Sequence, residues 1–152
     1  MTDEFLLNDK QVAMDAVLAA CHVAAERCAE GADIVDEDAG LAASLRHAAQ
    51  KHGEAEDALR GIIRRTDHLP QGENDEKEWL TSLAVQLRAL VSPERTTRVI
   101  EACLKSETDV LDAMQGMSAF SLEPPLEACL TDLRELVRQT MQTLQQARPA
   151  SD

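Results

Sequence analysis

The sequence predicts an all-α protein, a four-helix bundle of two antiparallel hairpins joined by a crossover helix. Apolar residues recur at steps of three and four along four long segments, which places them on one face of a helix. The two-residue alternation that strands require is absent. Aromatic residues make up only 2% of the chain, whereas strands are enriched in them. Four one-sided helices can bury their apolar faces only against each other, so a bundle follows.

The bundle is predicted to cover residues 9–147 and to follow a short N-terminal arm of residues 1–8. Its first hairpin comes directly after this arm. Its two helices cover about residues 9–35 and 41–66. The polar stretch 36–40 ends in glycine and interrupts the periodicity, as a tight turn does. The expected buried faces carry Met14, Val17, Leu18, Cys21, Ala25, Cys28 and Ala32, then Leu41, Leu45, Ala48, His52, Ala55, Leu59, Ile62 and Ile63.

The second hairpin is predicted from helices over about residues 93–116 and 124–147, followed by a tail at 148–152. Its first helix starts at Ser92-Pro93-Glu94, where a cap residue precedes a proline in the first turn. The expected buried faces carry Val99, Ile100, Cys103, Leu104, Val110, Leu111 and Met114, then Leu126, Cys129, Leu130, Leu133, Val137, Met141 and Leu144.

A further amphipathic segment, at about residues 75–91, lies between the two hairpins and contains Trp79. A helix of this length spans about 25 Å at 1.5 Å per residue. That distance is most of the length of such a bundle. A connection of this size favours a ferritin-like topology over a simple up-down-up-down bundle.

The charge of the chain excludes several classes of partner. With 15 basic and 28 acidic residues the net charge is −13, which repels nucleic-acid phosphates and anionic lipid. No stretch approaches the roughly 20 apolar residues of a membrane span. The acidic N-terminus also lacks the features of a signal peptide. We therefore expect no nucleic-acid partner, no membrane insertion and a cytoplasmic location with reduced cysteines.

Two polar residues fall where the periodicity predicts apolar ones. At about 100° per residue, Glu107 lies at the centre of the inner face of helix 93–116, and His52 lies equally centrally on helix 41–66. A buried, ionised Glu needs a proton, a partner or a metal ion, and His52 is its nearest sensible partner. The pair is either part of a metal centre in the core or a hydrogen-bonded pair that fixes the helix register.

The ligands that a dinuclear metal centre needs are incomplete in this sequence. The Glu-x-x-His pair that di-iron bundles place on a helix is missing. The candidate metal ligands are therefore Glu107, His52 and Glu54, and no catalytic or cofactor-binding residue is predicted. His22 and Glu26, four residues apart and off the apolar stripe, are expected to form a solvated surface pair.

All four cysteines lie on the predicted inner faces, at positions 21, 28, 103 and 129. Soft sulfur ligands inside a bundle would suit Cu(I). The alternative is that each cysteine packs as a small apolar residue. No Cys-x-x-Cys motif is present, which favours the packing interpretation.

The stretch Ile100-Glu101-Ala102-Cys103-Leu104-Lys105-Ser106-Glu107 resembles the Ile-Leu-x-x-Cys-x-x-Gly-Glu stretch of small bacterial ferritin-like, rubrerythrin-type four-helix bundles of unknown function. Ser106 stands in place of the glycine. With the hairpin layout and the crossover helix, the resemblance covers about residues 12–144 and implies a ferritin-like fold. Ferritin-like di-iron proteins carry an inward carboxylate on the first helix and a histidine on the fourth, where this sequence has Ala25 and Met141. The resemblance thus implies a dinuclear centre of which only Glu107 is retained, with His52 as a substitute.

The function expected from these observations is that of a non-catalytic, ferritin-like helical bundle without a cofactor, which acts through self-association or a protein partner. The alternative is a metal-binding or redox bundle protein that uses Glu107 and His52 to hold iron or another divalent metal. For a homodimer, Trp79 and Phe120 are the candidate contacts, because large apolar side chains at a crossover or a turn must be covered. They could equally cap the ends of the bundle.

Overall fold

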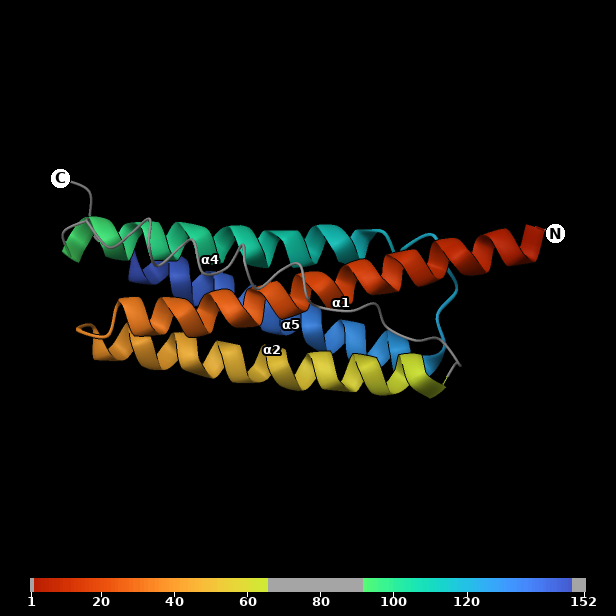
Figure 1. Ribbon diagram of the computed structural model, residues 1–152, viewed down its shortest axis with the longest axis horizontal. Helices are drawn as coiled ribbons and strands as arrows, with labels where there is room; N and C mark the ends of the chain where they lie inside the picture. Colours follow the sequence, from red (N-terminus) through yellow and green to blue (C-terminus); the bar gives the residue numbers. More distant parts are fainter. Residues whose placement is uncertain (1, 66–91, 149–152) are drawn as a thin grey trace.

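The computed structural model describes residues 2–65 and 92–148, and within them the chain is an all-α four-helix bundle (Figure 1). The helices are α1 (Thr2–Ile34), α2 (Ala39–Arg65), α4 (Ser92–Gln115) and α5 (Pro124–Ala147). Each packs against two others, in the pairs α1–α2, α1–α4, α2–α5 and α4–α5. The sequence-based prediction of an all-α four-helix bundle is therefore confirmed.

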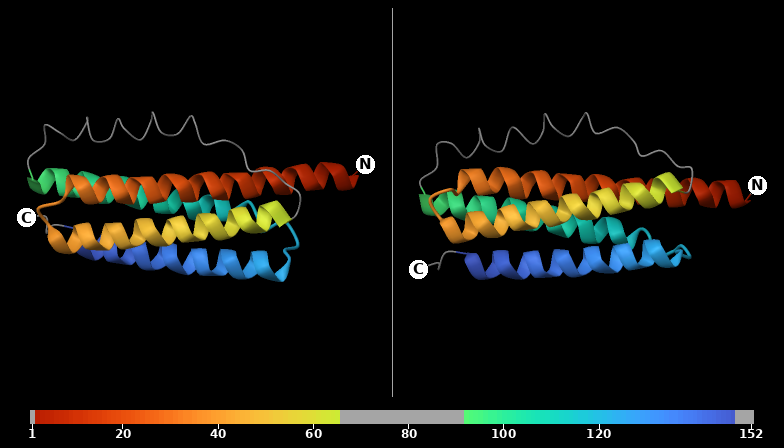
Figure 2. Two further views of the ribbon diagram at one scale, coloured as in Figure 1. Left: turned by 60° about the horizontal axis from the view of Figure 1, so that its bottom comes forward. Right: turned by 90° about the horizontal axis from the view of Figure 1, so that it is seen from below.

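Neighbouring helices run in opposite directions around this ring (Figures 1 and 2). Consequently the diagonally opposite helices are parallel, α1 with α5 and α2 with α4. In Figure 1, α2 ends at one end of the bundle and α4 begins at the other. The crossover helix predicted at 75–91, with Trp79, lies outside the described residues.

The ends of the helices follow local sequence signals. Asp38 caps α2, because its carboxylate Oδ1 accepts a hydrogen bond from the backbone N–H of Leu41 at 3.1 Å. Pro124 opens α5, at a position where the missing N–H costs nothing. The other end of α5 closes with the backbone N–H of Arg148 bonded to the carbonyl of Gln145.

The helix α1 begins at Thr2, so it includes residues 2–8 of the segment predicted as an N-terminal arm. This stretch contains no glycine or proline to interrupt a helix. The apolar periodicity begins later, at Met14, and for that reason the predicted start was too late.

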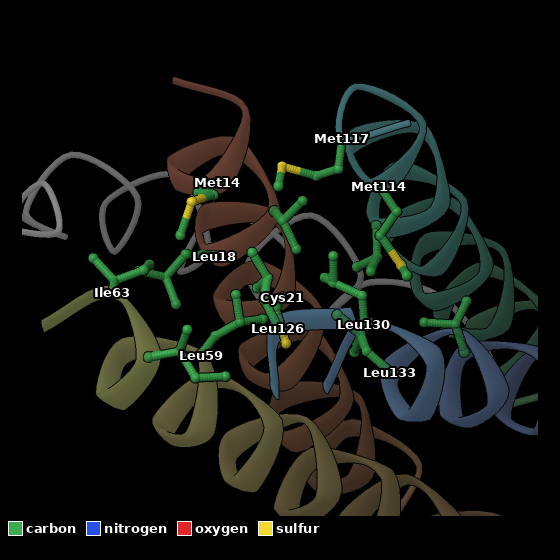
Figure 3. Packing of buried hydrophobic residues seen from close by; sticks show 14 of the residues in the cluster. Met14, Leu18, Cys21, Leu59, Ile63, Met114, Met117, Leu126, Leu130 and Leu133 are labelled. Atoms are coloured by element: carbon green, nitrogen blue, oxygen red, sulfur yellow. The ribbon is translucent and has the colours of Figure 1, made fainter. Parts of the chain in front are cut away.

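The core consists of two apolar clusters along the bundle axis. One contains Met14, Leu18, Leu59 and Leu130, and Figure 3 shows its side chains converging from all four helices. The other lies towards the α1–α2 turn and includes Leu45. Between the two clusters lie buried polar side chains, among them His52 of α2 and Glu107 of α4.

The first helix approaches α4 closely at Gly31. A Cβ atom there would lie 2.8 Å from Cγ1 of Val99 and 3.4 Å from Sγ of Cys103. Only glycine allows this spacing, so Gly31 sets how near the two backbones come. None of the helices in the described part of the chain has the length and apolar character needed to cross a membrane.

Candidate functional site: a buried His–Glu pair

The polar layer between the two apolar clusters is built around His52 and Glu107. Nε2 of His52 lies 2.7 Å from Oε1 of Glu107, and both side chains are 0% exposed. His52 comes from α2 and Glu107 from α4, which are diagonally opposite, so the contact crosses the centre of the bundle. The prediction that these two residues meet is confirmed.

The hydrogen bond requires one proton between the two groups. The proton lies either on Nε2 of the imidazole, which then donates to the carboxylate, or on Glu107, whose carboxylic acid then donates to Nε2. In either case the contact satisfies one polar atom of each side chain, which burial in an apolar core requires.

The second oxygen of Glu107 has no such partner. Oε2 is buried and makes no hydrogen bond to any residue that the structure describes. A buried polar atom in this condition costs about 1–3 kcal/mol. The described residues therefore leave one polar atom of the site without a hydrogen bond.

A thiol completes the surroundings of the imidazole. Sγ of Cys21 lies 3.9 Å from Nδ1 of His52 and donates a hydrogen bond to the His52 carbonyl at 3.4 Å. Burial raises the pKa of the Cys21 thiol well above its ordinary value, and the negative charges of Glu56 and Glu107 raise it further. Cys21 is therefore held as a neutral thiol, which is a poor metal ligand and a poor nucleophile.

The third predicted ligand, Glu54, lies elsewhere. Its side chain is 55% exposed on the outer side of α2, where it accepts a hydrogen bond from Gln50 and pairs with Lys51 at 3.4 Å. It follows His52 by two residues, and a step of two residues turns the helix by about 200°. The structure thus brings Glu107 and His52 together and leaves Glu54 apart from them.

Within residues 2–65 and 92–148, no group of three or more His, Cys, Asp or Glu side chains is arranged to hold a metal ion. The expected inward position on the first helix is also shifted by one residue. Ala24 is 0% exposed, whereas Ala25 is only partly buried. Neither supplies a carboxylate. Met141 of α5 is partly buried and packs against the apolar cluster that contains Met14, Leu18, Leu59 and Leu130.

A second polar network, missed in the sequence, joins α1 to α2. Nδ1 of His22 lies 3.0 Å from Oε1 of Glu56, and Oε2 of Glu56 accepts hydrogen bonds from Arg60 at 2.9 and 3.1 Å. The predicted surface pair of His22 with Glu26 is wrong, because His22 faces α2 and only 12% of its side chain is exposed. The available signal was the spacing of Glu56, four residues after His52 and four before Arg60, which places all three near one face of α2.

All four cysteines are free, and two more of them have raised pKa values. A hydrogen bond with Cys103 and burial raise the pKa of Cys28 far above its ordinary value. Partial burial and the charge of Asp132 raise the pKa of Cys129. Because the thiolate is the reactive form, the raised pKa values of Cys21, Cys28 and Cys129 leave these three thiols without activation as nucleophiles.

The central site offers one imidazole and one carboxylate, which are hydrogen-bonded to each other and fully buried. Two protein ligands are fewer than the three that catalytic metal sites usually supply. The arrangement fixes the position of α2 relative to α4, because a shift of either helix would break a fully buried hydrogen bond. Comparison with protein-family models, with curated proteins and with solved structures gives no match for this chain.

Proposed function

We propose that the protein is a non-catalytic helical bundle that acts through association with itself or with a protein partner. The observation that carries this proposal is the His52–Glu107 pair: the two potential metal ligands contact each other at 2.7 Å, and both side chains are 0% exposed. A substrate has no open path to such a pair, and the neighbouring thiol of Cys21 is not activated. The pair then acts as a structural contact that specifies the helix register.

The same proposal includes a ferritin-like topology and a cytoplasmic location. The parallel direction of α2 and α4 supports the topology, because two hairpins joined in this way need a connection along the bundle. The four unpaired thiols support the location, since such cysteines are typical of a reducing compartment. The incomplete ligand set agrees with a ferritin-like bundle in which the dinuclear centre is not assembled.

One observation favours the alternative, a metal-binding or redox bundle protein. Oε2 of Glu107 is a fully buried carboxylate oxygen without a hydrogen-bond partner among the described residues, and a cation would satisfy it. Iron or another divalent metal held by Glu107 and His52 would need further ligands from water.

Metal loading separates these two functions. Under the main proposal, adding Fe(II), Mn(II) or Zn(II) to the purified protein leaves its Tm unchanged, and elemental analysis after purification without added metal finds less than stoichiometric metal. A metal ion that binds a specific site, present at a free concentration of 100 times its Kd, would stabilise the fold by about 2.7 kcal/mol. This raises Tm by several degrees.

The matched control for this experiment is Glu107→Gln, which preserves the shape of the side chain and removes its charge. Stoichiometric metal in the wild type that is lost in Glu107→Gln would overturn the main proposal and establish the alternative. Metal that stays bound in Glu107→Gln would instead be assigned to the acidic surface, which the proposal allows.

A further inference from the structure

The α2–α5 interface leaves a long groove on the outside of the bundle, with a volume of about 860 Å³. Its floor is made of small and apolar side chains, among them Ala55, Ala58, Gly61 and Ala128. Ala58 and Ala128 are exposed. Small residues allow another helix to approach closely, so the shape of the groove suits a packed helix better than a compact ligand.

The two rims of the groove carry opposite charges. The α2 rim has Lys51, Arg65 and Glu54, a sum of +1, whereas the α5 rim has Asp132 and Glu135, a sum of −2. The helices α2 and α5 are antiparallel (Figure 2), and His47 and Gln139 line one neighbouring pocket together. Lys51 follows His47 by four residues and Glu135 precedes Gln139 by four, so Lys51 and Glu135 lie at the same end of the groove. This face is therefore complementary to a face with the reversed arrangement of charges.

We infer that this groove is the contact surface for a second copy of the chain. Two copies related by a twofold axis that runs along the groove would place α2 of each over α5 of the other. Lys51 of one copy would then face Glu135 of its mate, and the exposed alanines would pack between the helices. Glu54 would lie level with Asp132 of the mate, where its charge is offset by its own pair with Lys51 at 3.4 Å. A twofold axis across the groove would instead place α2 over α2, with like charges opposed, which the rim charges disfavour.

The inference rests on the proposed function, since it names the partner through which the bundle acts. It also replaces the earlier expectation for the dimer contact. Phe120 lines a different groove, between α4 and α5, and Trp79 lies outside the described residues. The net charge of −13 on each copy opposes association at long range. At physiological ionic strength the screening length is about 8 Å, so the charges at the contact decide the outcome.

The test measures mass and dimer affinity by sedimentation equilibrium at 0.15 M salt. The wild type should show twice the chain mass of 16.6 kDa at micromolar concentration. Lys51→Glu should raise the dimer Kd by about tenfold or more, because it places a glutamate opposite Glu135 of the mate, and the twofold axis repeats this repulsive contact. Glu135→Lys should do the same, and the double variant Lys51→Glu/Glu135→Lys should restore the wild-type Kd.

The control is Arg134→Glu, an exposed α5 residue that lines the α4–α5 groove instead. It changes the net charge by the same amount as Lys51→Glu, and it should leave the Kd within about threefold of wild type. A monomer at all concentrations, an equal loss of affinity in Arg134→Glu, or no rescue in the double variant would overturn the inference. A monomeric protein without metal would leave the partner-protein form of the proposed function standing, whereas specific metal binding would overturn that function whatever the mass.

Discussion

The strongest consequence of the buried His52–Glu107 pair is the cost of removing one member. Replacing Glu107 with leucine keeps a similar volume and leaves His52 buried, with Nε2 facing an apolar group in place of a carboxylate at 2.7 Å. Breaking a buried pair in this way costs about 3–5 kcal/mol. In a domain of this size each kcal/mol lowers Tm by about 2–4 °C.

The double variant His52→Leu/Glu107→Leu should behave differently from the single one. When both members are replaced by apolar side chains, no uncompensated polar group remains, and such replacements are often neutral or stabilising by about 1–4 kcal/mol. Oε2 of Glu107 strengthens this expectation, because it has no hydrogen-bond partner among the described residues and its replacement removes that cost. The double variant is therefore expected to be at least as stable as the wild type.

Urea unfolding followed by far-UV circular dichroism measures these free energies. Glu101→Leu on the same helix is the control, since Glu101 is 41% exposed and pairs with Arg98 and Arg148 at the surface. It should cost about 0–1 kcal/mol. The reasoning is refuted if Glu107→Leu costs no more than Glu101→Leu, or if the double variant is as unstable as the single one.

Two further predictions follow from the packing of α1. Gly31→Ala should destabilise the fold by about 1–3 kcal/mol in urea unfolding, because its Cβ would overlap with the stiff side chain of Val99 at 2.8 Å. Adding Val99→Ala to this variant should recover most of the loss. The control is Gly53→Ala, whose Cβ meets nothing within 4 Å and which should stabilise the fold by about 0.5–1 kcal/mol. If Gly31→Ala is as benign as Gly53→Ala, the close approach is not real. Above the ordinary thiol pKa of about 8.5, the unfolded chain releases protons that folded Cys21 and Cys28 retain, since their pKa values are raised. Stability is then complete below pH 8.5 and falls above it by about 1.4 kcal/mol per pH unit per thiol. Cys28→Val should halve the part of this slope that the two thiols contribute, and an unchanged slope in urea titrations at pH 8, 9 and 10 would contradict the raised pKa.

The helices themselves were predictable because the information lies within each one. A period near 3.6 in the apolar residues fixes which face of a segment is buried, whatever it packs against. That rule placed Leu45, Leu59, Ile100 and Leu133 inside, and all four are buried. It also marked His52 and Glu107 as buried polar residues, and their burial made a partner necessary.

The second polar network escaped the same reasoning because its residues lie at the edge of the buried face. His22 and Glu56 are 12% and 11% exposed in their side chains. At such an angle, a small rotation of the helix decides between solvent and a neighbouring helix. Periodicity read at about 100° per residue does not resolve that rotation, so Glu26 and Glu56 were not distinguished as partners of His22.

The sequence by itself determined the all-α class, the faces that each helix buries and the presence of a histidine and a glutamate inside. Only the tertiary structure decided that these two residues meet across the diagonal from α2 to α4, that Glu54 points outward, and that a groove with oppositely charged rims runs between α2 and α5. The physical reason is that a periodic pattern gives the angular position of a residue about its own helix. Which helix lies opposite, and at what depth, is set by how all four apolar faces pack together.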